Sequence, residues 1–181
     1  MKKAAARLTL MLLLMLMVSG PAFSAMTLTS TDMVSGDPIP NTHIYPRCGG
    51  RNISPQLSWS GAPSGTQSLV LTMIDVDVKP SQWSHWIVVD IPPSAFSLPQ
   101  GARSLPGRAT AVVSNFGDAA YAGPCPPKGT GMHHYQFTIW AMPTTTVTLA
   151  SDDKATKLTD FLAQRALDRG WLTALVQAPA G

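Results

Sequence analysis

Three of the four histidines and two of the ten aspartates lie beside the most apolar segments of the chain. Asp75 and Asp77 follow one such segment, His85 lies within a second, and His133 and His134 precede a third. An imidazole can donate or accept a hydrogen bond near neutral pH, and a carboxylate accepts hydrogen bonds or pairs with a cation. Together with backbone N–H groups, these side chains could form a small polar pocket for an anionic or zwitterionic ligand.

Each of these residues also has a purely structural interpretation. Aspartates at a strand end commonly close turns, and a histidine beside tryptophan is commonly a hydrogen-bonded core residue. Consecutive strand residues point to opposite faces, so only one of His133 and His134 is expected to enter a given pocket. Asp75 and Asp77 are two residues apart and are expected to share a face.

The segments that position these residues have the pattern of β-strands. Residues 68–75 form a nearly continuous apolar run, which predicts a strand buried on both faces. Residues 83–91 and 135–141 predict two further strong strands. Shorter strands are predicted at 26–30 and 57–59.

The remaining chain predicts long loops and one late helix. Gly and Pro are frequent between residues 101 and 131, which is typical of a loop that could carry a site. Asp152 or Asp153 can cap a helix whose apolar residues follow helical spacing, and Gly170 is expected to close it. The pattern therefore predicts a single, mostly β domain with a late helix.

The N-terminus has the order of a bacterial secretory signal. Basic residues at positions 2, 3 and 7 precede the apolar run 8–18, and small residues follow at a cleavage site after Ser24. We therefore expect a signal peptide over 1–24 and one domain over 25–181, exported to the periplasm. A retained N-terminal anchor is the alternative, but the run is too short to span a bilayer.

The charge of the precursor does not indicate a nucleic-acid partner. The chain has 13 Lys and Arg against 10 Asp, a net charge of +3. Removal of the three basic residues before the apolar run leaves ten basic residues against the ten acidic ones. A neutral domain has no general attraction for phosphate backbones, so we predict no nucleic-acid binding.

The two cysteines, Cys48 and Cys125, both lie in the part predicted to be exported. An even pair in an oxidising compartment favours a disulfide over two free thiols. If Cys125 were free, it could act as a nucleophile with His133 as base, but no G-x-S-x-G or H-E-x-x-H motif supports an enzyme. Metal ligands of the right residue types are present in His85, His133 and Asp75. The same side chains can instead bind an anion, so no metal and no cofactor are predicted.

Several motifs resemble those of the phosphatidylethanolamine-binding protein (PEBP) family, in particular its bacterial Raf-kinase-inhibitor-like branch. They occur in order over about residues 30 to 145. The chain departs from the family where His134 replaces a common Arg and where Val76, Val78 and Lys79 replace prolines and an alanine. The matching segments are CGGRNISPQLSW (48–59), DVDV (75–78), SHWIV (84–88), YAGPCPPKG (121–129) and GMHHYQF (131–137).

The resemblance implies a Greek-key-like antiparallel β-sandwich with peripheral helices. It also implies a cavity that binds small anions and phospho-head groups such as phosphoethanolamine. His85 and His133 would donate to phosphate oxygens, and Gly123 would let a backbone N–H approach the ligand. Carried over by position, the ligand-binding residues are Asp75, His85, Gly123, His133 and Tyr135, with Asp77 at the edge.

The sequence thus predicts a periplasmic binding protein for a small anionic or phosphorylated ligand, with a role in modulating a protein partner, and not an enzyme. A protein-interaction or kinase- or protease-inhibitor-like module is the alternative, and a Cys/His-dependent hydrolase ranks below it. The protein is not expected to span a membrane. Bacterial family members tend to be homodimers, so the resemblance leaves a homodimer open.

Overall fold

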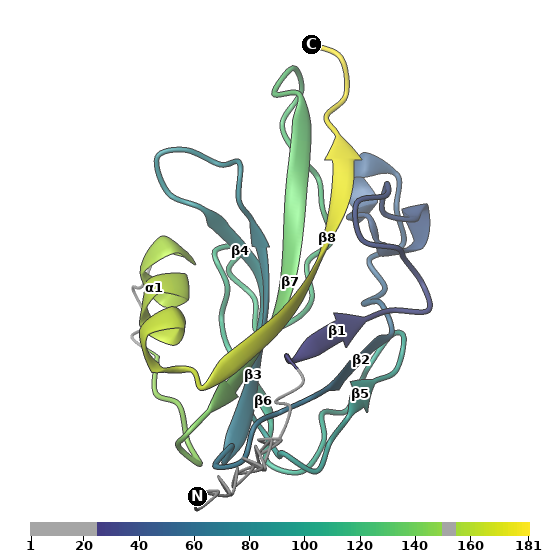
Figure 1. Ribbon diagram of the computed structural model, residues 1–181. Coiled ribbons are helices and arrows are strands. Elements are labelled where there is room, and N and C mark those ends of the chain that lie inside the picture. The colour runs from purple at the N-terminus through teal and green to yellow at the C-terminus, as the bar shows by residue number, and fades with distance from the viewer. Residues whose placement is uncertain (1–24, 150–154) are drawn as a thin grey trace, which may run out of the picture.

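Two antiparallel β-sheets and one α-helix make up the fold in the residues that the structure, a computed structural model, describes, which are 25–149 and 155–181 (Figure 1). The predicted signal peptide (1–24) and the predicted capping residues Asp152 and Asp153 lie outside the described residues. The small sheet has the order β1 (Thr27–Thr29), β2 (Leu57–Ser60), β5 (Ser97–Leu98). The large sheet has the order β6 (Thr110–Ala111), β4 (Trp83–Ile91), β3 (Ser68–Asp75), β7 (Met132–Met142), β8 (Asp168–Gln177).

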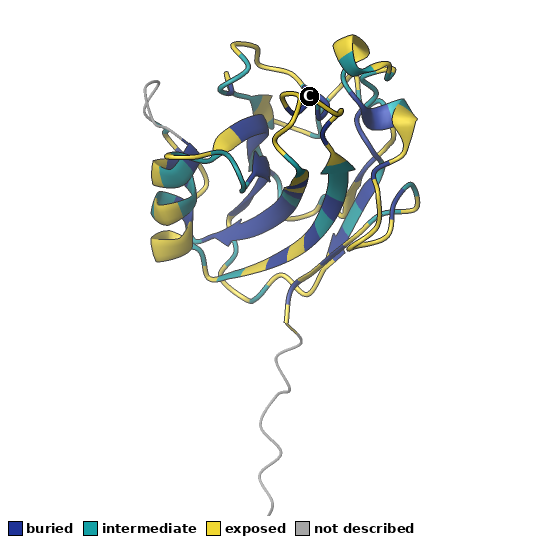
Figure 2. Ribbon diagram, turned by 90° about the horizontal axis from the view of Figure 1, so that it is seen from above, coloured by how far each residue is buried: buried dark blue, intermediate teal, exposed yellow. Residues whose placement is uncertain are grey.

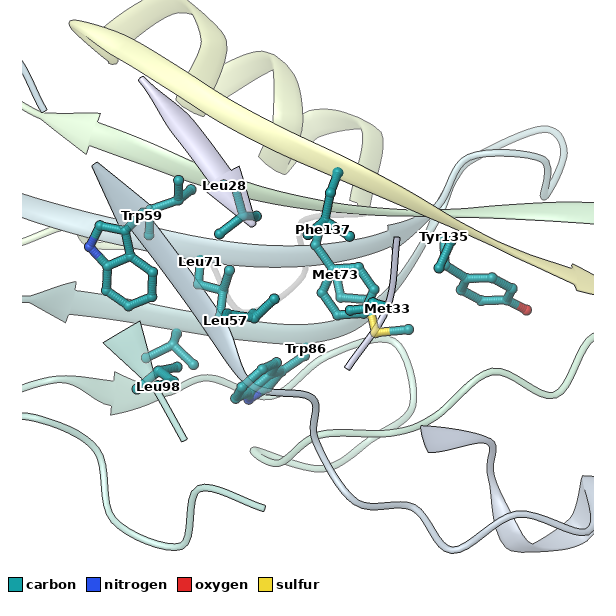
Figure 3. Packing of buried hydrophobic residues seen from close by; sticks show 14 of the residues in the cluster. Leu28, Met33, Leu57, Trp59, Leu71, Met73, Trp86, Leu98, Tyr135 and Phe137 are labelled. Atoms are coloured by element: carbon teal, nitrogen blue, oxygen red, sulfur yellow. The ribbon is translucent and has the colours of Figure 1, made fainter. Parts of the chain in front are cut away.

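The helix α1 (Ala155–Arg165) and the small sheet lie on opposite sides of the large sheet (Figure 1). Strand β3 is buried along its whole length because both of its faces are covered (Figure 2). Leu71 packs with Trp59 of the small sheet in the larger core (Figure 3), whereas Val70 packs with Leu162 of α1 in a second core. Burying such a side chain contributes roughly 1.5–3 kcal/mol, so the apolar run fixes this central strand.

The strand order explains how distant parts of the chain meet. Strands β3 and β4 pair as neighbours, and β7 then returns after a long connection to pair with the other edge of β3. All pairings within the two sheets are antiparallel. The predicted class, a mostly β, Greek-key-like fold of packed antiparallel sheets, is confirmed. Within residues 25–149 and 155–181, the peripheral helices are α1 and two single-turn 3-10 helices, η1 (Asn41–His43) and η2 (Pro46–Cys48).

The predicted helix end at Gly170 is wrong. The helix α1 ends at Arg165, and Gly170 lies inside β8, a strand that the sequence pattern did not indicate. Glycine is needed there because β1 passes close by: a Cβ on Gly170 would lie 2.6 Å from the carbonyl carbon of Thr27. Packing between strands, and not helix termination, therefore accounts for this glycine.

The predicted disulfide is present. Cys48 and Cys125 are bonded, with Cα atoms 5.5 Å apart, and the bond joins η2 to the Pro-rich loop before β7. Because Cys125 is bonded, it offers no thiolate, which removes the nucleophile that the hydrolase interpretation required. In the part of the chain that the structure describes, no helix combines the length and apolar character needed to cross a bilayer.

Candidate functional site

Three neighbouring strands meet at one end of the large sheet and place polar side chains on one face. Asp75, the last residue of β3, pairs with Trp83 of β4 and with Tyr135 of β7. Directly opposed residues of antiparallel strands share a face, so the three side chains lie together. A cavity of about 300 Å³ opens there. Its wall consists of Arg47, Asp75, Val78, Trp83, His85, Phe116, Cys125, Pro126, Pro127 and Tyr135.

His85 enters the cavity wall because the pairing of β3 and β4 is irregular. The register shifts between Met73 and Ile74, and His85 is the extra residue on β4. Simple alternation would turn His85 to the face opposite Trp86, but the extra residue breaks the alternation and re-aims the His85 side chain. Trp86 therefore packs in the core between the sheets, and His85 lines the cavity.

The environment of His85 makes it a neutral hydrogen-bond acceptor. Its Nδ1 lies 2.9 Å from the carbonyl oxygen of Ala122, which can only accept, so Nδ1 carries the proton. Burial lowers the pKa of His85 to about 4, although the Ala122 carbonyl and the Asp75 carboxylate oppose this shift. At neutral pH Nε2, the nitrogen without the proton, is therefore a hydrogen-bond acceptor. This differs from the sequence-based expectation of a donor to phosphate.

His133 lies behind the cavity wall, hydrogen-bonded at both ring nitrogens. Its Nδ1 is 2.7 Å from Oδ2 of Asp75, and its Nε2 is 2.8 Å from Oγ1 of Thr130. The single hydroxyl proton of Thr130 is donated to the carbonyl oxygen of Pro127 at 2.7 Å, so Nε2 must donate to Thr130. Asp75 and His133 thus form a buried, hydrogen-bonded pair, with Asp75 in the cavity wall and His133 behind it.

Tyr135 supplies a protonated hydroxyl and an aromatic surface. Burial raises the pKa of Tyr135, and the Asp75 carboxylate beside it raises this pKa further. Its ring meets the His85 ring edge to face, with centroids 5.0 Å apart, and Phe116 lies 4.9 Å from His85 on another side. The cavity is thus polar at Asp75 and aromatic around it.

Asp77 points away from Asp75, so the prediction that the two share a face is wrong. The strand ends at Asp75, and the backbone N–H of Asp77 donates to Oδ1 of Asp75 at 3.1 Å. The Asp77 carboxylate accepts from the backbone N–H of His134 at 2.6 Å and lies 2.9 Å from its ring Nδ1. Partial burial acts to raise the pKa of Asp77, but these hydrogen bonds hold it below its ordinary value.

Gly123 packs against the chain and is absent from the cavity wall described above. Its N–H donates to Oδ1 of Asn52 at 2.7 Å, so it is not free to meet a ligand. A Cβ on Gly123 would lie 2.2 Å from the carbonyl oxygen of His43, which explains why only glycine fits. The amide of Asn52 also donates to the carbonyl oxygen of Tyr121 at 3.3 Å. Asn52 therefore positions the loop that ends at the disulfide.

Three of the six predicted ligand-binding residues line the cavity, namely Asp75, His85 and Tyr135. His133 contacts Asp75 from behind the wall, and Gly123 and Asp77 also lie outside it. His133 and His134 point apart in the structure, His133 being buried and His134 exposed. The sequence interpretation missed Arg47, Trp83 and Phe116 as wall residues. The predicted disulfide could have revealed Arg47, because it joins the next residue, Cys48, to the Pro-rich loop.

Comparisons with known proteins identify relatives of this chain. The family described as phosphatidylethanolamine-binding protein matches residues 29–177. The UPF0098 protein YbcL of Escherichia coli K12 is 39% identical over 137 residues, which cover 71% of this chain and 75% of YbcL. LppC of Mycobacterium tuberculosis H37Rv, named as a proposed lipoprotein, is 38% identical over 123 residues, covering 68% of this chain and 58% of LppC.

Two solved structures resemble the fold. The crystal structure of E. coli YbcL, described as a new member of the mammalian PEBP family, has a TM-score of 0.77 at 32% identity and covers 87% of this chain and 100% of YbcL. The proposed PEBP homologue CT736 of Chlamydia trachomatis has a TM-score of 0.69 at 31% identity, covering 84% of this chain and 97% of CT736. By its motifs, its fold and these matches, the chain belongs to the phosphatidylethanolamine-binding protein family.

Proposed function

We propose that this protein binds a small anionic ligand with a phosphorylated head group in the cavity at the end of β3. The observation that carries this proposal is the wall itself: the Asp75 carboxylate, the His85 acceptor nitrogen and the Arg47 guanidinium around one space of about 300 Å³. A zwitterion such as phosphoethanolamine fits these charges, because its ammonium group can meet Asp75 and its phosphate a cation. The name of the matched family supports this class of ligand.

Binding, and not catalysis, suits the state of these groups. The sulfur of Cys125 is bonded to Cys48, and both ring nitrogens of His133 are hydrogen-bonded to the protein. The remaining nitrogen is Nε2 of His85, and a group whose pKa is about 4 is a weak general base at neutral pH. We therefore propose that the protein is not an enzyme.

We place this binding function in the bacterial periplasm. The N-terminal segment has the order of an export signal, and the two cysteines are paired, as expected in an oxidising compartment. The relative named as a proposed lipoprotein is in keeping with export.

A protein-interaction module, in which ligand occupancy modulates a partner, is the second candidate function. It is favoured by large apolar side chains on the surface: Phe96 is 67% exposed and Trp171 is 56% exposed. A homodimer is one form that such an interaction could take. Light scattering of the purified protein, with and without phosphoethanolamine, distinguishes a dimer or a ligand-dependent assembly from a monomer.

Titration calorimetry of residues 25–181 with phosphoethanolamine tests the binding function. We expect saturable binding by the unmodified protein and an affinity about tenfold lower in His85→Gln, which loses the acceptor nitrogen and corresponds to one lost hydrogen bond. His134→Gln is the matched control, because His134 is exposed and does not line the cavity. Absence of binding by the unmodified protein at about 10 mM phosphoethanolamine would overturn the proposal.

A further inference from the structure

Arg47 is the residue with a fixed positive charge in the cavity wall. Besides Arg47, the wall contains one carboxylate, Asp75, and one histidine, His85. Asp75 is already hydrogen-bonded to the ring of His133, which lies behind the wall. Since His85 is neutral at pH 7, the positive charge that this wall offers to an anion comes from Arg47.

The guanidinium of Arg47 is available to a ligand. Among the described residues, the structure gives it no hydrogen bond and no ion pair, and the side chain is exposed. A guanidinium has five N–H donors in a planar fork that matches the oxygens of a phosphate group. The other wall groups do not duplicate this role, because Nε2 of His85 accepts and the Tyr135 hydroxyl lies beside Asp75.

The backbone around Arg47 is fixed at the cavity. Arg47 is the middle residue of η2, Pro46 begins this turn, and Cys48 ends it. The disulfide joins Cys48 to Cys125, which itself lines the cavity beside Pro126 and Pro127. A covalent bond one residue away therefore keeps the start of the Arg47 side chain beside the wall, which reduces the entropy lost when the side chain engages a ligand.

We infer that Arg47 is the anion-recognition residue of this cavity and that it selects phosphate monoesters over phosphate diesters. This inference rests on the proposed binding function. At pH 7.5 a phosphate monoester carries close to two negative charges, whereas a diester carries one. The Arg47 guanidinium has no protein partner among the described residues, so its electrostatic attraction to the dianionic monoester is stronger than to the monoanionic diester. Its planar fork can also hold two phosphate oxygens at once. Selectivity for the charge state of the phosphate thus follows from one side chain.

Calorimetry with phosphoethanolamine and with its diester, glycerophosphoethanolamine, tests the inference. In the unmodified protein we expect the monoester to bind about tenfold more tightly than the diester. In Arg47→Gln we expect the monoester affinity to fall about tenfold, the preference to disappear, and the salt dependence of binding to flatten. Arg47→Lys should retain part of the affinity, because it keeps the charge but loses the fork.

Arg51→Gln is the matched control, since Arg51 is exposed and does not line the cavity. Thermal unfolding should be unchanged in Arg47→Gln, because the side chain has no polar contact to lose. Equal monoester affinity of Arg47→Gln and the unmodified protein would overturn the role of Arg47 and leave the proposed binding function intact. A failure of the unmodified protein to bind either compound would overturn both.

Discussion

Replacing Cys48 and Cys125 together by serine is expected to lower the free energy of unfolding by about 4 kcal/mol. The bond connects residues 77 positions apart, so it removes many open conformations from the unfolded chain. The bond also joins η2 to the Pro-rich loop before β7. These two segments otherwise share few backbone contacts, such as the hydrogen bond from the Tyr45 N–H to the Pro124 carbonyl oxygen. Urea unfolding of both proteins under non-reducing conditions measures the difference.

A reducing agent supplies the control for this prediction. It should destabilise the unmodified protein by a similar amount and leave the double serine variant unchanged. A loss below about 1 kcal/mol would contradict the prediction and would mean that the unfolded chain is already compact around these residues. Since Cys48 adjoins Arg47, the double variant should also bind phosphoethanolamine more weakly, which calorimetry can separate from stability.

Acidification from pH 7.5 to 4.5 is expected to cost about 2 to 3 kcal/mol of folding free energy through His85 alone. Burial, the main cause, lowers the pKa of His85 from 6.5 to about 4 in the folded protein. Between these values the unfolded chain binds a proton that the folded protein does not. Stability therefore rises with pH across this window and is lost as the pH falls from about 6.5 toward 4.

The comparison with His85→Gln isolates this contribution. Glutamine has an amide donor for the Ala122 carbonyl oxygen but no group that titrates. Urea unfolding at several pH values should give a steeper fall for the unmodified protein than for the variant. The lowered pKa values of Asp32 and Asp77 act below this window, where those carboxylates take up protons, and both residues are present in the two proteins. Parallel curves would contradict the buried, neutral state of His85.

The structure also changes what a substitution of His133 should do. From the sequence, alanine at His85 or His133 is expected to weaken binding and to leave stability nearly intact. Both side chains are buried and hydrogen-bonded, so each change removes a partner from a buried polar group. Loss of the His133 ring would leave the buried Asp75 side chain without its hydrogen-bond partner. Binding defects in these variants must therefore be read together with their stability.

The sequence by itself determined the central strands and the residue types of the site. The apolar run 68–75 and the segment 83–91 coincide with β3 and β4, because burial on both faces requires continuous apolar side chains. The pairing of the two cysteines was predicted from their even number and from the oxidising compartment that the N-terminal segment indicates. The strand β8 was missed because its residues carry no clear alternation and Gly170 resembles a helix end.

Only the tertiary structure decided what each side chain of the site can do. The tautomer of His85 depends on Ala122, 37 residues away, and the hydrogen-bond partner of His133 is Asp75, 58 residues away. The bulge that turns His85 into the cavity arises from the register between two strands, and the place of Arg47 arises from a disulfide to another loop. Local sequence encodes strand pattern, whereas pKa values, hydrogen-bond roles and cavity walls are set by residues that meet only after folding.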